Sequence, residues 1–241
     1  MKEYPILFST DMVKAILDGR KTQTRRTLKN QPIDIIPMNV PNEWVTLKER
    51  NPNHGQVVKC RYGDVGDRLW VRETHYRWGQ WVKNGFAKTG RQAWTFKAVS
   101  NTMGGVRMPD NRPPFGEFDR TQTGWHKRPS IHMPRWASRI TLEITEIRAE
   151  RLQEITFEDC LTEGIVHTKE WQEVDYKAPE LINPTDLSNE EADKEIDRGW
   201  IAYAQQAFAK LWDSLNAKRG HSWESNPWVW VIGFKENDGF T

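Results

Sequence analysis

The sequence predicts one α+β domain over residues 1–241, enlarged by two insertions at about 75–130 and 166–200. The observations behind this are strand-like segments at 4–8 and 228–234, helix-like segments between them, and two long stretches without a sustained period. The length is enough to bury a core without disulfides or metals. A charged fraction of 28% and ordinary apolar content exclude collagen, a coiled coil and a wholly disordered chain.

The first elements follow from local patterns. A short buried strand is expected over 4–8, followed by a helix capped by Ser9 or Thr10. Gly19 is the expected left-handed stop of that helix, and the polar alternation over 22–28 predicts an extended segment. The helix is predicted by four apolar residues at helical spacing: Met12, Val13, Ile16 and Leu17.

Later elements are separated by less regular stretches. Residues 29–66 carry scattered Pro, Asn and Gly and are expected to be mostly loop. The stretch 75–130, rich in Gly, Pro and Trp, is expected to form a loop-rich flap with aromatic anchors that folds over the mouth of a cavity. The remaining expected elements are strands at 67–74, 139–147 and 228–234, a short helix at 156–164 and a long helix at 188–216, both helices opening with capping-box patterns.

Several classes of site are excluded by composition and spacing. Two cysteines, Cys60 and Cys160, are too few for a disulfide framework and are expected to be inert packing residues in a cytoplasmic protein. No apolar run approaches the ~20 residues that span a bilayer, so no membrane contact is expected. The six histidines lack metal-ligand spacing and no Gly-rich phosphate loop is present, so we expect neither a metal nor another cofactor.

The charge distribution is more informative than the net charge of +2. One basic stretch, 14–29, contains a single acid, and another, 127–139, contains none. Such runs are either solvated surfaces or sites for a polyanion, and the sequence leaves both open. The basic residues in them are Lys14, Arg20, Lys21, Arg25, Arg26 and Lys29, then Lys127, Arg128, Arg135 and Arg139.

The segment 19–26 (GRKTQTRR) stands where the first helix ends and an extended segment begins. Lys21, Thr24 and Arg26 supply an amine with a tunable pKa, a hydroxyl and a permanent guanidinium cation. Spacing alone leaves two interpretations, a solvated basic turn or the wall of a binding site.

The pattern Gly-x-Lys-x-x-Thr-x-Arg after an amphipathic helix resembles the signature of the ASCH domain family. Further matches follow in order at 66–73 (GDRLWVRE), 140–151, 161–164 (LTEG) and 228–234. Together they are similar to ASCH proteins common in phages and prophages. The resemblance implies a PUA-like β-barrel with flanking helices, to which the two insertions are additions.

The resemblance also implies possible functions. Many ASCH proteins are assigned RNA-related binding, and one small bacterial type is an amidohydrolase that removes acetyl from N4-acetylcytidine. Its Lys, Thr and later Glu correspond here to Lys21, Thr24 and Glu163. The usual motif has Glu where this chain has Thr24, which favours the hydrolase type.

This chemistry requires a lowered pKa of Lys21. A lysine activates a hydroxyl only if its pKa falls from ~10.4 toward ~7–8. The nearby cations Arg20, Arg25 and Arg26 act in that direction, whereas a tight pair with Glu163 would raise the pKa. The sequence leaves this balance open.

A nucleoside or RNA, possibly DNA, is the expected partner. Arg20, Arg25 and Arg26 are candidate contacts, and Arg128, Arg135 and Trp136 form a second candidate surface because arginine holds phosphate and tryptophan stacks on bases. The rival interpretations are a non-catalytic RNA- or DNA-binding module and, less favoured, a ribonuclease using the same basic residues. Protein partners are not predicted.

Overall fold

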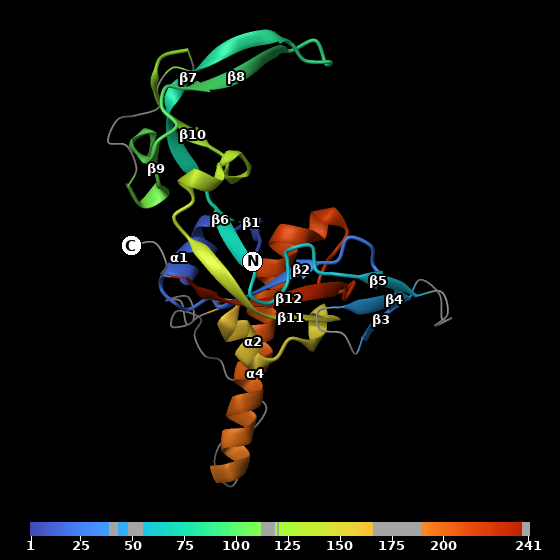
Figure 1. Ribbon diagram of the computed structural model, residues 1–241. Coiled ribbons are helices and arrows are strands. Elements are labelled where there is room, and N and C mark those ends of the chain that lie inside the picture. Colours follow the sequence, from blue (N-terminus) through green and yellow to red (C-terminus); the bar gives the residue numbers. More distant parts are fainter. Residues whose placement is uncertain (39–42, 48–54, 112–118, 120, 166–188, 238–241) are drawn as a thin grey trace. The chain divides into compact units, whose positions relative to one another are not determined.

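The protein is a mixed α+β chain in which strands predominate (Figure 1). The computed structural model describes residues 1–38, 43–47, 55–111, 119, 121–165 and 189–237. The chain divides into two compact units, each assembled from separate segments. Unit 1 comprises Met1–Lys14, Asp67–Glu143 and Glu236–Thr241, and unit 2 comprises Ala15–Gly66 and Ile144–Lys235.

Five strands follow one another in a single sheet, in the order β1-β6-β11-β12-β2. β1 runs parallel to β6, whereas β6 with β11 and β12 with β2 are antiparallel. The strands expected near both ends of the chain and at 67–74 and 139–147 are confirmed. β1 and β2 end the order, and the described strands form no closed barrel. The bounds are β1 Glu3–Leu7, β2 Gln23–Thr27, β6 Arg68–Arg72, β11 Thr141–Arg151 and β12 Trp228–Glu236.

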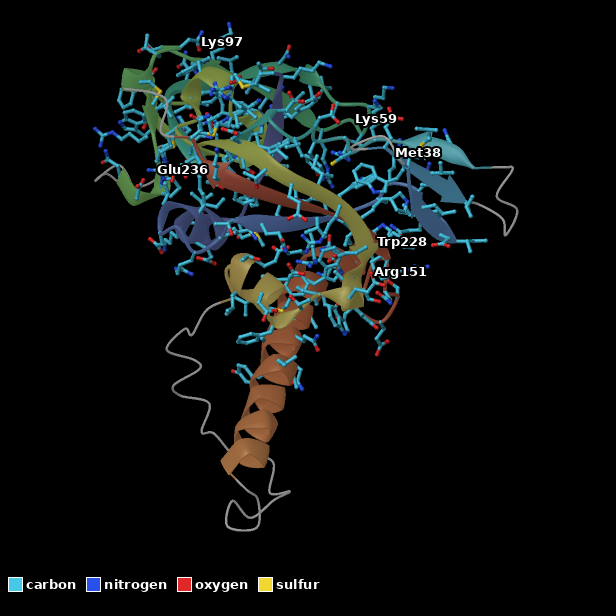
Figure 2. All side chains as sticks on the ribbon, turned by 60° about the horizontal axis from the view of Figure 1, so that its bottom comes forward. Met38, Lys59, Lys97, Arg151, Trp228 and Glu236 are labelled. Atoms are coloured by element: carbon cyan, nitrogen blue, oxygen red, sulfur yellow. The ribbon has the colours of Figure 1, made fainter. Side chains whose placement is uncertain are left out.

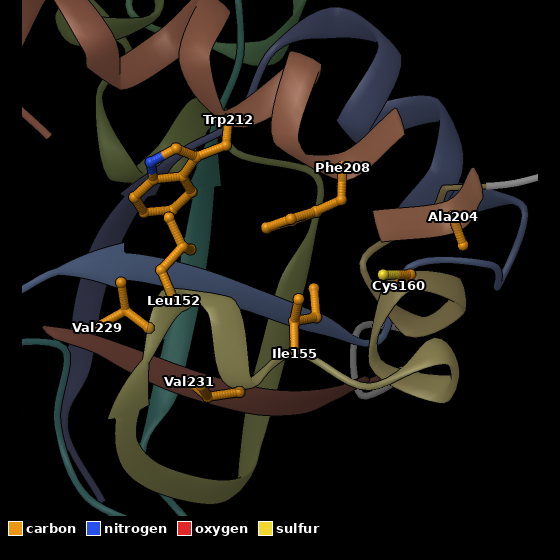
Figure 3. Packing of buried hydrophobic residues seen from close by; sticks show 8 residues of the cluster. All are labelled: Leu152, Ile155, Cys160, Ala204, Phe208, Trp212, Val229 and Val231. Atoms are coloured by element: carbon orange, nitrogen blue, oxygen red, sulfur yellow. The ribbon is translucent and has the colours of Figure 1, made fainter. Parts of the chain in front are cut away.

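The three expected helices are confirmed as α1 (Thr10–Leu17), α2 (Phe157–Thr162) and α4 (Asn189–Asn216). The long helix α4 contributes a buried face to the core of unit 2, shown in Figure 3. Ile201 and Leu215, whose apolar side chains the helical spacing would place on the buried face, are instead 40% and 43% exposed. The core cluster consists of Leu152, Ile155, Cys160, Ala204, Phe208, Trp212, Val229 and Val231.

The expectation of loop over 29–66 is wrong for much of that stretch. β3 (Asp34–Pro37), β4 (Trp44–Leu47) and β5 (Gln56–Val58) form an antiparallel three-stranded sheet. Strands of three or four residues show too little alternation for a period to emerge, and tertiary packing decides the conformation. The ring of Trp44 on β4 packs edge-on against Trp230 of β12, with centroids 4.7 Å apart.

The expectation that 75–130 consists mostly of loops is also wrong where the structure describes it. β7 (His75–Phe86), β8 (Gln92–Ala98) and β10 (Gly124–Arg128) form an antiparallel sheet in the order β10-β7-β8, and β9 (Val106–Arg107) also pairs with β7. Aromatic and polar residues occur on both faces of these strands, so no alternation of apolar and polar residues marks them. Residues 112–118 and 120, and 166–188 of the second predicted insertion, lie outside the described residues, while 189–200 belong to α4.

Short 3-10 turns connect these elements. The small core of unit 1 is built from Val106, Met108, Met133 and Ala137, and Ala137 lies in one of these turns. Arg151 ends β11 and Trp228 begins the neighbouring strand β12. The Arg151 guanidinium lies 4.5 Å from the Trp228 ring centroid, and both residues are labelled in Figure 2. No helix of the described chain is long and apolar enough to cross a membrane. The 3-10 turns are Met103–Gly105, Pro109–Asn111, Ser130–His132, Arg135–Ala137, Leu152–Glu154 and Ala217–Arg219.

Gly79 of β7 lies where two strands approach too closely for a side chain. A Cβ atom there would stand 2.3 Å from the Lys97 carbonyl oxygen and 2.7 Å from the Phe96 ring. We expect Gly79→Ala to destabilise the protein by about 1–3 kcal/mol, because the clash involves backbone that cannot move aside. The free energy of unfolding, measured in urea by tryptophan fluorescence, tests this. Gly104→Ala, where the nearest atom is 3.7 Å away, is the matched control, and equal effects of the two substitutions would contradict the prediction.

Candidate functional site

Two helix ends position the main residues of the candidate site. Gly19 and Gly164 stand two residues after the ends of α1 and α2, with φ of +71° and +86°. In each turn the glycine N–H donates to the carbonyl three residues earlier, and the next N–H donates to the carbonyl five residues earlier. This is the Schellman arrangement, which needs a residue in the left-handed region. The expected stops at Gly19 and Gly164 are therefore confirmed.

The segment after Gly19 runs along the end of α2. The Thr22 N–H donates to the Thr162 carbonyl at 2.9 Å, and the Thr22 carbonyl accepts from Phe234 of β12 at 2.8 Å. A Cβ on Gly164 would lie 3.2 Å from the Lys21 Cβ, so a larger residue would crowd the lysine. Backbone contacts thus bring Lys21 to the end of α2, where Glu163 stands.

Lys21 and Glu163 form a buried ion pair. The Lys21 Nζ donates to Glu163 Oε2 at 2.6 Å and to the Glu163 carbonyl oxygen at 2.8 Å. The lysine side chain has no exposed surface, and the glutamate side chain is 5% exposed. The structure therefore brings together two of the three residues predicted to act in catalysis.

Burial lowers the pKa of Lys21 below its usual range. Desolvation penalises the charged amine most strongly, and the guanidinium groups of Arg26 and Arg25 add to the lowering. Glu163 opposes both effects by stabilising the ammonium form. The sequence left open whether the pKa of Lys21 is raised or lowered. The structure lowers it, although Glu163 does pair with the lysine.

Arg25 connects the ion pair to a wider set of charges. From β2, its Nη1 donates to Glu163 Oε1 at 3.4 Å and its Nη2 to Asp159 Oδ2 at 2.7 Å and to Glu150 of β11. Its side chain has no exposed surface. Arg25 is therefore buried among three carboxylates, and Glu163 accepts from two cations of the segment 21–25.

Asp159 is the second centre of this network. Its carboxylate accepts from Gln23 at 2.9 Å and from Arg148 at 2.8 and 2.9 Å, in addition to Arg25. Burial alone would raise its pKa, but Gln23, Arg25 and Arg148 together lower it to about 2. Asp159 also closes the capping box of α2 with Thr156, so one side chain serves the helix start and the network.

Sequence reasoning missed Arg148, Glu150 and Asp159. The available signal was the run of alternate charged residues Glu146, Arg148 and Glu150, which a strand places on one face. Asp159 also fits the capping-box pattern at the start of α2, and this local role gives no sign of its second one.

Thr24, the third residue of the predicted set, is buried on β2. Because Gln23 and Arg25 both bind Asp159, strand alternation places Thr24 on the opposite face of β2. Among the described residues, no hydrogen bond joins its hydroxyl to Lys21 or Glu163. Arg26 shares the Thr24 face, and burial lowers its pKa. Arg20 is more peripheral and pairs with Asp18 at 2.8 Å.

The second predicted surface belongs to unit 1, whereas residues 19–26 belong to unit 2. The Arg128 guanidinium lies over the rings of Trp81 and Phe96, 4.6 and 4.7 Å from their centroids. Arg135 makes a bidentate pair with Glu3 at 2.7 and 2.8 Å, which neutralises its charge. Trp136 is 38% exposed, and the Arg77 guanidinium lies over its ring.

The two cysteines are free thiols in buried positions. Burial raises the pKa of Cys60 to about 11 and that of Cys160 to about 12, so both stay protonated near neutral pH. The described part of the chain contains no group of three His, Cys, Asp or Glu side chains suited to a metal ion.

Comparison with known proteins adds no further information. The chain matches no protein-family model, no curated protein and no solved structure. The resemblance to ASCH proteins therefore rests on the sequence motifs alone.

The lowered pKa of Asp159 predicts a specific sensitivity to acid. A carboxylate whose pKa falls from 3.8 to about 2 on folding adds stability that is present above pH 3.8 and lost as the pH falls through 2. The shift corresponds to about 2 kcal/mol. We expect Asp159→Asn to be less stable than the wild type at pH 6 and to lose less stability between pH 5 and pH 2. Urea unfolding across this range measures the difference.

Glu158→Gln is the matched control because Glu158 is exposed on the same helix. It should keep the pH dependence of the wild type. Equal slopes for the wild type and Asp159→Asn would contradict the prediction.

Proposed function

We propose that this chain is an ASCH-type protein of PUA-like fold that takes an acylated cytidine and hydrolyses its acetyl amide. The observation that carries the proposal is the buried Lys21–Glu163 pair, in which the lysine pKa is lowered. The order of the matched segments adds support, since they coincide with β2, β6, β11, the end of α2 and β12. The proposed compartment is the cytoplasm.

The pair has the properties that a general base requires. A lysine exposed to water is protonated at neutral pH and cannot accept a proton. Desolvation favours the neutral amine of Lys21, while two bonds to Glu163 orient its nitrogen. Arg25 holds the other carboxylate oxygen of Glu163, so it acts as a positioning residue for the pair.

The proposed reaction has two steps. In the first, the Thr24 oxygen bonds to the acetyl carbon while neutral Lys21 takes the hydroxyl proton. The bond from that carbon to N4 of cytidine then breaks, and the Lys21 ammonium returns the proton to the leaving nitrogen. In the second, water cleaves the Thr24 ester, which releases acetate and regenerates the hydroxyl. This step requires the Thr24 hydroxyl and the Lys21 amine to come within hydrogen-bond reach of each other in the substrate complex.

The first test incubates purified protein with N4-acetylcytidine and measures cytidine and acetate by chromatography. Lys21→Met and Thr24→Ala should each lower turnover by at least ~10²-fold, the lower range for a positioned acid–base group. Thr24→Ser should retain measurable turnover because it keeps the hydroxyl. Lys59→Met is the matched control, since Lys59 forms an exposed ion pair with Glu43.

Removing one partner of a buried pair costs about 3–5 kcal/mol of stability, so turnover is normalised to the folded fraction. Wild-type turnover in folded Thr24→Ala would exclude Thr24 as the nucleophile. Nucleoside binding by the wild type without any turnover would favour the non-catalytic binding module.

A second test uses the pH dependence of turnover. The base must be deprotonated, so kcat/KM should rise with pH through the lowered pKa of Lys21. Glu163 raises this pKa, and Glu163→Gln removes that effect. We therefore expect the rising limb of Glu163→Gln to lie at lower pH than in the wild type, with reduced maximal turnover. If kcat/KM of Glu163→Gln instead rises at higher pH than that of the wild type, Glu163 does not raise the pKa of Lys21.

A further inference from the structure

One face of the β7–β8–β10 sheet in unit 1 combines aromatic rings with cations. Antiparallel partners share a face, and the register places Tyr76 opposite Lys127, Trp78 opposite Trp125, and Gln80 opposite Lys97. Arg107 of β9 also stands opposite Tyr76. We refer to Tyr76, Trp78, Lys97, Arg107, Trp125 and Lys127 as the platform.

The platform residues are accessible. The two lysines are exposed, and Tyr76, Trp78, Arg107 and Trp125 are partly exposed. Lys97 is labelled on this sheet in Figure 2. Trp78 and Trp125 meet edge to face with centroids 5.5 Å apart, and the Arg107 guanidinium lies 5.0 Å from the Trp125 centroid. Two large rings in the middle of the face are thus flanked by cations on both sides.

The opposite face of the same sheet differs. There the Phe96 ring lies over Gly79, and Arg128 covers the rings of Trp81 and Phe96. His75 and His126 on that face are buried. The protein's own side chains therefore cover much of that face, and the platform is the better candidate for an external partner.

The sheet has no negative charge of its own. β7, β8, β9 and β10 contain no Asp or Glu, whereas they contain six Lys and Arg residues. The pairing of Arg107 with a ring leaves its positive charge in place, because an aromatic ring is neutral. The partner that fits is a flexible polyanion carrying planar rings.

We propose that the platform binds single-stranded nucleic acid, with bases stacking on Trp78 and Trp125 and phosphates meeting Lys97, Arg107 and Lys127. Stacking on aromatic rings beside a cationic groove is how single strands are held without sequence preference. A duplex offers phosphates but keeps its bases stacked on each other. This inference does not rest on the amidohydrolase proposal, since it concerns different residues and needs no reaction.

The test measures the anisotropy of a fluorescein-labelled single-stranded RNA of about 12 nucleotides with the full-length protein at low salt. We expect saturable binding, at least ~5-fold weaker binding of the corresponding duplex, and DNA of the same sequence within about threefold of the RNA. Trp78→Ala should raise Kd by at least ~5-fold. Equal affinity for single strand and duplex would overturn the stacking part of the proposal.

Charge variants keep the test decisive if the tryptophan variant fails to fold. Lys97→Glu and Lys127→Glu change exposed side chains and should each raise Kd and lower the slope of log K against log salt by at least ~0.7. Lys83→Glu is the matched control, because Lys83 is an exposed lysine of the same sheet that shares the opposite face with Trp94.

A Lys83→Glu effect as large as that of Lys97→Glu would show attraction by net charge alone and overturn the assignment to this face. Absence of saturable binding by the wild type would overturn it altogether. Neither outcome depends on hydrolysis, so failure of the acetylcytidine assay and failure of this one are separable.

Discussion

The arrangement of unit 2 around the candidate site depends on burying the carboxylates of Asp159 and Glu163 beside cations from the segment 21–25. A carboxylate or ammonium group taken out of water costs several kcal/mol unless it meets an opposite charge in good geometry. Lys21 and Arg25 supply two such charges to Glu163, and Arg25 also binds Asp159. Displacing α2 from β2 would leave these groups buried and unpaired, so the charges specify the packing more strictly than apolar contacts would.

The same pairing also sets the balance between the neutral and charged forms of Lys21. Burial drives Lys21 toward the neutral amine, while Glu163 favours the ammonium form, so the two states are closer in free energy than in water. A group balanced in this way can accept and return a proton at little cost. The surrounding carboxylates do not all share this balance, since Asp159 is held in its charged form by Arg25 and Arg148. One carboxylate is thus structural, and the other faces the titrating lysine.

Local signals in the sequence predicted much of the fold. The helix stops at Gly19 and Gly164, the capping box of α2 and the strands β1, β2, β6, β11 and β12 followed from patterns within a few residues. The pairing of Lys21 with Glu163, by contrast, joins residues 142 positions apart, and no local pattern encodes it. The sheet of β7, β8, β9 and β10 was not predicted for another reason: its strands carry aromatic and polar residues on both faces, so no alternation of apolar and polar residues marks them.

The arginines around Asp159 and those of the β7–β8–β10 sheet are held differently, and this bears on what each set can bind. In unit 2, Arg25 and Arg148 are held by carboxylates, which satisfy the guanidinium groups and cancel much of their field. In the sheet of unit 1, Arg107 and Arg128 lie against aromatic rings, which fix the side chains without neutralising them. A guanidinium positioned by a ring has already lost much of its rotamer freedom, so less entropy is lost when a phosphate arrives. The ring-supported cations are therefore better suited to an external anion than the paired arginines beside Lys21.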